Sequence, residues 1–224
     1  HPTERSTRGR SIVFFAFAAL AADALAQQLG SRTTVYVPEN GLISLNIPLN
    51  AGRTGSLSTK TTHPVFMMRL QAIWDALSMP ALLDRPYAYR TKGEMLLECR
   101  DQPNLLLLAP ASTSCGRFSK YGYRHCGRCV PCMVRRASFM HAGMPDNSPK
   151  GYVFDNLSQR RPATGADDIG AVARAVLGIQ TGGAAAFSAG QFAFAPPNER
   201  RLFEGVVQRG FAEIGALLSG HDVL

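Results

Sequence analysis

The sequence predicts an α/β fold with a zinc loop of four cysteines and a helical C-terminal region. A β-branched run at residues 33–37 follows an apolar segment with helical spacing. Four cysteines lie at C-x10-C-x2-C-x2-C within residues 112–139. Residues 167–177 and 199–218 repeat apolar positions with a helical period. The chain has 224 residues and a hydrophobic content of 46%, so it can bury a globular core.

Residues 11–29 form the first expected element, a buried helix. Gly30 ends this run, in which apolar residues recur at helical spacing: Ile12, Phe15, Ala19, Ala22 and Leu25 or Ala26. The same stretch also has the basic flank, apolar run and Ala-Leu-Ala of a secretory signal. We expect the helix, because zinc-binding thiolates further along the chain fit poorly with export.

The expected strand at residues 33–37 leads into a polar turn. Open α/β sheets place ligand-binding residues at the carboxyl ends of their strands. At this end Glu39 could accept two hydrogen bonds from the N–H groups of a guanine-type base, and Asn40 could donate and accept. An ordinary turn would use the same residue types.

A loop-rich stretch crowded with hydroxyl groups follows at residues 42–64. We interpret it as a substrate-facing loop, with Thr61, Thr62 and His63 as candidate contacts. A solvated connection would also explain the pattern, with Thr61 or Thr62 capping a helix that starts at Pro64.

A helix, a strand and a capped helix are expected next. Residues 65–77 are amphipathic and predict these core side chains: Phe66, Leu70, Ile73, Trp74 and Leu77. Residues 86–90 suggest a short strand. Thr91 and Glu94 have the spacing of a capping box, which leaves Lys92 unexplained.

The cysteine spacing predicts a zinc site. Two residues between thiolates allow a tight turn to direct both sulfurs at one ion about 2.3 Å away. The predicted ligands are Cys115, Cys126, Cys129 and Cys132. Four thiolates leave no position for water, which indicates a structural zinc, although His125 could replace one of them. Cys99 is a fifth thiol and favours a reducing, cytoplasmic compartment.

These residues carry a resemblance to a known family. The loop cysteine, the C-G-x-C-x2-C run, Tyr121-Gly122-Tyr123 and the segment RRASF are similar to the zinc-binding end of the 7-cyano-7-deazaguanine synthases. Upstream, PENGLISLNIPL and SLSTKTTHP resemble the synthase-like proteins of Qat-type anti-phage operons most closely. The resemblance covers about residues 5–142.

The resemblance implies a nucleotide α-hydrolase-like fold with a parallel sheet, as in pyrophosphate-loop ATPases. It implies an ATP-dependent ligase, with Mg²⁺, that adenylates a 7-carboxy-7-deazaguanine-like substrate. Ammonia then gives an amide and finally a nitrile, or the acid is joined to a partner protein of a defence operon. Lys92 would lie near the ATP phosphates, and Arg8, Arg10 and Ser11 would face phosphate at a helix N-terminus. Solvated arginines with a serine N-cap at Ser11 would explain the same residues.

The family's S-G-G-x-D-S loop for ATP is absent from this sequence. We therefore expect a fold incomplete at its N-terminal side, the C-terminal portion of a longer protein, and no ATP hydrolysis by this portion alone. We expect a ligase domain over residues 1–142 and a helical appendage over residues 143–224, with no membrane association; a homodimer stays open.

A binding module is the alternative function. The net charge is +8 and the pI is near 9.6, which favours an anionic partner. Such a zinc module would bind RNA without catalysis, through phosphate contacts and stacking on Tyr121 and Tyr123. The basic residues proposed for these contacts are Arg117, Lys120, Arg124, Arg128, Arg135 and Arg136.

Overall fold

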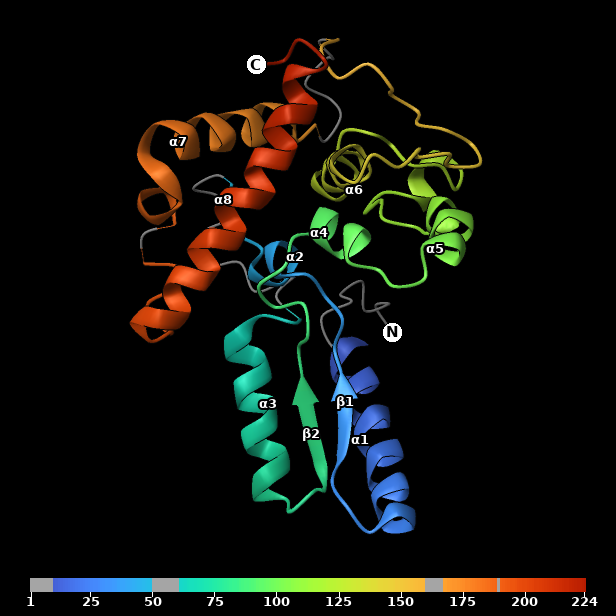
Figure 1. Ribbon diagram of the computed structural model, residues 1–224, viewed down its shortest axis with the longest axis vertical. Helices are drawn as coiled ribbons and strands as arrows, with labels where there is room; N and C mark the ends of the chain where they lie inside the picture. Colours follow the sequence, from blue (N-terminus) through green and yellow to red (C-terminus); the bar gives the residue numbers. More distant parts are fainter. Residues whose placement is uncertain (1–9, 50–60, 160–166, 189) are drawn as a thin grey trace, which may run out of the picture. The chain divides into compact units, whose positions relative to one another are not determined.

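The computed structural model describes residues 10–49, 61–159, 167–188 and 190–224 (Figure 1). The chain forms two compact units, one of residues 1–48 and 52–88 and the other of residues 49–51 and 89–224. The sequence-based boundary between residues 142 and 143 lies inside the second unit.

The first unit is a two-stranded parallel sheet with helices packed against it (Figure 1). Its elements are α1 (Arg10–Leu29), β1 (Thr33–Tyr36), α2 (Gly41–Leu45), α3 (Pro64–Ala76) and β2 (Ala81–Asp84). The strands pair in the register Thr33 to Ala81 and Tyr36 to Asp84. Ala19, Ala22, Trp74 and Ala81 form one buried cluster, so α1 and α3 share a core with the sheet. A small α/β unit is therefore present.

Packing in this unit corrects three predictions. The strand expected at residues 86–90 is wrong, because β2 lies earlier, at Ala81–Asp84, and residues 86–89 form a turn. Ile73 and Leu77 were expected in the core but are 55% and 66% exposed, whereas Met67 is buried. The predicted helix at 11–29 and the strand at 33–37 are confirmed to within one residue at each end. The expectation that this helix is buried is wrong, because Phe14, Phe17 and Leu20 are 63–67% exposed.

Two helices, Ser11–Leu29 and Ile169–Phe187, are long and apolar enough to cross a membrane by length and composition. Core helices and signal sequences have the same properties. In both helices one face packs inside its own unit, through Ala19 and Ala22 in the first helix and Val172 and Val176 in the second.

The second unit is helical. It contains α4 (Lys92–Leu97), α5 (Gln102–Leu108), η2 (Ala109–Ala111), η3 (Ser119–Tyr121), α6 (Val130–His141), α7 (Ile169–Phe187) and α8 (Pro197–Ser219). α8 contacts both α6 and α7, and α4 packs on α6. The two predicted C-terminal helices are present but longer than expected. Gly183 has a non-helical backbone, with a φ of 78° and a ψ of 159°, so α7 consists of two helical segments joined by a kink at this residue.

Candidate metal centre

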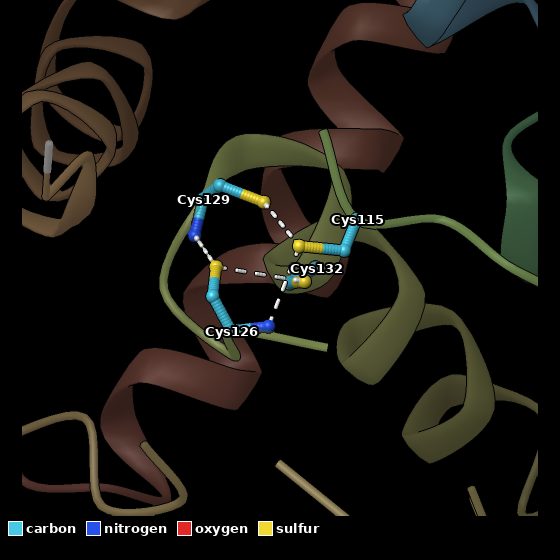
Figure 2. A group of neighbouring side chains, drawn as sticks. All are labelled: Cys115, Cys126, Cys129 and Cys132. Atoms are coloured by element: carbon cyan, nitrogen blue, oxygen red, sulfur yellow. Dashed lines mark hydrogen bonds between the residues drawn. The ribbon is translucent and has the colours of Figure 1, made fainter. Parts of the chain in front are cut away.

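Four cysteine sulfurs converge at the N-terminal end of α6 (Figure 2). The Sγ atoms of Cys115, Cys126, Cys129 and Cys132 all lie within 4.8 Å of one another. Two of the pairs, Cys126 with Cys132 and Cys115 with Cys129, are 3.9 Å apart. A tetrahedron with metal–sulfur bonds of about 2.3 Å has edges of about 3.8 Å. The four thiols could therefore hold one metal ion with little rearrangement.

Backbone N–H groups direct the sulfurs inward. The Cys126 and Arg117 N–H groups each donate to Cys115 Sγ at 3.3 Å, and the Cys129 N–H donates to Cys126 Sγ at 3.3 Å. Gly127 has a φ of 88°, and a Cβ at that position would collide with the Phe154 carbonyl. Glycine is thus needed inside the first C-x2-C turn.

The cluster is closed to solvent. All four cysteines are buried, and aromatic side chains pack around them: Phe118, Tyr121, Tyr152 and Phe154. Shared thiol protons lower the pKa of Cys126 and raise the pKa of Cys129 to about 12. Four buried sulfurs cannot all ionise without a cation, and they leave no coordination position for a substrate. The four cysteines could therefore hold a metal ion that is closed to substrates.

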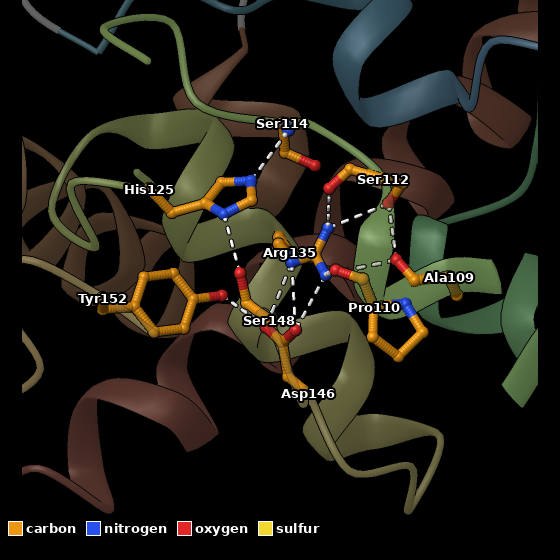
Figure 3. Close-up of polar contacts among 9 residues, drawn as sticks. All are labelled: Ala109, Pro110, Ser112, Ser114, His125, Arg135, Asp146, Ser148 and Tyr152. Carbon is orange, nitrogen blue, oxygen red and sulfur yellow. Dashed lines mark hydrogen bonds and ion pairs between the residues drawn. The ribbon is translucent and has the colours of Figure 1, made fainter. Parts of the chain in front are cut away.

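Arg135 lies next to this cluster and joins α6 to two separate segments (Figure 3). Its side chain is 1% exposed. It donates to both carboxylate oxygens of Asp146 at 2.8–3.1 Å, and to the carbonyls of Ala109, Pro110 and Ser112 at 2.7–3.2 Å. It therefore holds the chain that leads into Cys115 in position.

His125 belongs to the same network and not to the sulfur cluster. Its Nε2 accepts from the Ser114 N–H at 3.2 Å, which leaves Nδ1 as the donor to Ser148 Oγ at 3.0 Å. Burial and the nearby Arg135 lower the pKa of His125, which favours the neutral ring. Both ring nitrogens are thus engaged away from the four sulfurs.

The other arginines named for RNA binding are also engaged within the protein. Arg128 bonds to Asp167 at 2.7 Å and to the Asn156 and Leu157 carbonyls. Two further arginines form ion pairs, Arg136 with Asp155 at 3.2 Å and Arg117 with Asp168 at 3.4 Å. Arg124 donates to the carbonyls of Lys150 and Tyr152. Tyr121 packs on Phe154 with ring centroids 5.6 Å apart, whereas Tyr123 is exposed. Most of the arginine side chains expected to contact phosphate therefore already bond to other groups of the same chain.

In the first unit, the predicted substrate residues lie after β1 and before α3. Asn40 is buried and caps α2, because its side chain accepts from the Ile43 N–H at 3.1 Å. Asn40 also donates to Glu39 Oε1 at 3.5 Å. Glu39 and Asn40 lie just beyond the end of β1, where the sequence placed them. One role of Asn40 is to cap α2.

Thr62 and His63 also have structural partners. Thr62 Oγ1 lies 3.1 Å from Ser44 Oγ, which ties the segment before α3 to α2. His63 is buried and caps α3, with Nδ1 accepting from the Val65 N–H at 3.3 Å. Thr61 is partly buried beside them. The residue that caps α3 is therefore His63, and not Thr61 or Thr62.

The predicted phosphate-binding residues are divided between the two units. Arg8 lies outside the described residues, and Arg10 and Ser11 open α1. Lys92 belongs to the second unit, where it is partly buried at the start of α4, between Thr91 and Glu94 of the confirmed capping box.

Arg85 is a candidate that the sequence pattern did not reveal. It follows β2 directly, and its Nη1 is buried without a hydrogen-bond partner. A cationic residue just beyond the carboxyl end of a strand would have indicated this site. Because the strand was expected at residues 86–90, Arg85 was placed before the strand and not after it.

Comparisons with known proteins return no relatives. No protein-family model matches the chain, and neither a curated protein nor a solved structure matches it.

Proposed function

We propose that Cys115, Cys126, Cys129 and Cys132 bind one structural zinc ion. The observation that carries this proposal is the convergence of four buried sulfurs with 3.9 Å edges, close to those of a zinc–thiolate tetrahedron. A disulfide would need sulfurs about 2.05 Å apart, and all five cysteines are free. Zinc is the metal that tetrahedral thiolate sites of this kind usually hold.

Metal analysis of reduced protein tests this proposal. We expect one zinc per chain in the wild type and in Cys99→Ser, and loss of the zinc in Cys132→Ser. Chelation should lower the melting temperature of the wild type and of Cys99→Ser, because binding to the folded state stabilises it. Wild-type protein that is folded and free of metal would contradict the proposal.

We further infer that the chain belongs to an ATP-dependent carbon–nitrogen ligase acting on a 7-carboxy-7-deazaguanine-like acid. Three features support this. The first unit is a parallel α/β pair, Glu39 and Asn40 follow the carboxyl end of β1, and Arg85 follows that of β2. Ligands of open α/β sheets bind at such strand ends. Glu39 would accept from the base N–H groups, and the Arg85 guanidinium would face an anionic group.

The chemistry assigns few tasks to side chains. Transfer of AMP from ATP to the acid releases pyrophosphate, and ammonia then displaces AMP to give the amide. A second ATP adenylates the amide oxygen with release of pyrophosphate, and loss of AMP, which carries that oxygen, together with the remaining N–H proton gives the nitrile. Lys92 would offset the developing phosphate charge. The sequence contains no S-G-G-x-D-S loop, so we assign turnover to the protein that supplies it and substrate binding to this chain.

Calorimetry with 7-carboxy-7-deazaguanine tests the binding step on the chain itself. Glu39→Gln should weaken binding about tenfold or more, because a charged acceptor is lost. Glu204→Gln, on α8 of the second unit, is the matched control and should bind as the wild type does. Equal affinity of wild type and Glu39→Gln would remove Glu39 from the site.

Turnover is tested on the protein that includes the ATP loop. Pyrophosphate release should require the deazapurine acid and should be lost in Lys92→Ala but kept in Lys150→Ala, a change at an exposed lysine. Undiminished release in folded Lys92→Ala would exclude Lys92 from catalysis.

A further inference from the structure

A cavity opens beside α6, in the second unit. Its volume is about 540 Å³, within the range of small-molecule sites. Most of its lining is apolar or aromatic: Phe139, Met140, Met144, Tyr152 and Leu217. Arg136 is the cationic residue of the lining. None of these residues is a predicted metal ligand or a member of the proposed deazapurine site.

Arg136 is buried with part of its hydrogen-bonding capacity unused. Its side chain is 8% exposed and lies over the Tyr152 ring, 4.7 Å from the centroid. Nη2 donates to the Asp155 carbonyl at 2.9 Å and to Asp155 Oδ1 at 3.2 Å, and lies 2.9 Å from His221 Nε2. Nη1 is buried without a hydrogen-bond partner. A buried donor without an acceptor is unfavourable, so the site lacks an acceptor for Nη1.

The two carboxylates that line the cavity do not supply that acceptor. Asp146 bonds to Arg135 and to the Tyr152 hydroxyl. Asp155 is 83% exposed, and its carboxylate accepts from Nη2 of Arg136 and not from Nη1. Their negative charges also disfavour a polyanion such as phosphate. A ligand with one negative charge and an apolar body suits this lining better.

We propose that this cavity binds a small monocarboxylate with a flat apolar body, whose carboxylate accepts hydrogen bonds from the Arg136 guanidinium. The body would lie against Phe139, Met144 and Leu217. Because Nη1 is closed to solvent, the guanidinium must turn towards the cavity as the ligand binds. Planar, bidentate pairing is the arrangement in which arginine binds a carboxylate most strongly.

Calorimetric titration with 2-naphthoate and its neutral analogue 2-naphthamide tests the proposal on the wild-type chain. Naphthoate should bind about tenfold or more tightly than the amide, because only the acid forms charge-assisted bonds. Arg136→Gln should reduce naphthoate affinity to that of the amide and leave amide binding unchanged. Met144→Trp, which fills the cavity and keeps the arginine, should weaken both ligands.

Controls separate this site from the deazapurine site. Glu39→Gln should leave naphthoate binding unchanged, and Arg136→Gln should leave deazapurine binding unchanged. Absence of naphthoate binding to wild type, or wild-type affinity in folded Arg136→Gln, would overturn the proposal. If Arg136→Gln loses its helical circular dichroism, Met144→Trp decides the question. A tenfold loss of naphthoate affinity in that variant supports the site, and an unchanged affinity refutes it.

Discussion

Replacement of Arg135 by alanine should destabilise the second unit more than the same replacement of an exposed arginine. The variant leaves Asp146, whose side chain is 13% exposed, without its guanidinium partner. It also removes the donors to the Ala109, Pro110 and Ser112 carbonyls. Removal of one partner from a buried ion pair costs about 3–5 kcal/mol. We expect a loss in this range for Arg135→Ala. We expect a smaller loss for Arg135→Lys, which keeps the charge but not the planar fork.

Urea unfolding followed by far-ultraviolet circular dichroism measures this loss, because the second unit is largely helical. With an m-value of about 2 kcal/mol/M, the midpoint should fall by about 1.5–2.5 M. Arg174→Ala is the matched control, an exposed arginine on α7 that should change stability by about 0.5 kcal/mol at most. A midpoint for Arg135→Ala equal to that of Arg174→Ala would refute the reasoning.

Two further predictions concern a glycine and a buried acid. Gly127→Ala should weaken zinc affinity in a chelator competition far more than Gly122→Ala. Both glycines have positive φ, but only at Gly127 does a Cβ meet the Phe154 carbonyl, so equal losses would contradict this account. Burial raises the pKa of Glu213, so the folded state keeps this proton at a pH where the unfolded chain has lost it. The free energy of unfolding should therefore fall as pH rises above about 4.5 towards the folded-state pKa. Glu213→Gln should lack this fall. If the free energy of unfolding changes with pH in the same way in the wild type and in Glu213→Gln, Glu213 is not its cause.

Features encoded by neighbouring residues could be predicted from the sequence. The spacing of the cysteines identified all four members of the sulfur cluster, because two of the turns that bring them together are only four residues long. The capping box of Thr91 and Glu94 is equally local, and the structure contains both of its hydrogen bonds.

Features that depend on distant partners could not be predicted. Residues 81–84 and 86–90 are both short and partly apolar, and pairing with β1 decides that the first of them is the strand. Likewise, the amphipathic period of residues 65–77 does not show that Ile73 and Leu77 are more than half exposed. In the same way, the small-residue segment around Gly183 has the composition of a loop, but the structure has helical turns on both sides of a kink at that residue.

The arginines around the cluster show why charge was the least informative signal. The net charge of +8 suggested an electropositive surface for an anionic partner. In the structure, Arg128, Arg135 and Arg136 are all buried. Arg128 and Arg136 bond to carbonyls of residues 155–157, and Arg135 bonds to carbonyls of residues 109–112. Those segments have few backbone partners of their own, so guanidinium groups satisfy carbonyls that helices and strands would otherwise bond. Part of the positive charge therefore stabilises the fold around the metal centre. The unused Nη1 of Arg136 stands out because its neighbours Arg128 and Arg135 are so fully engaged.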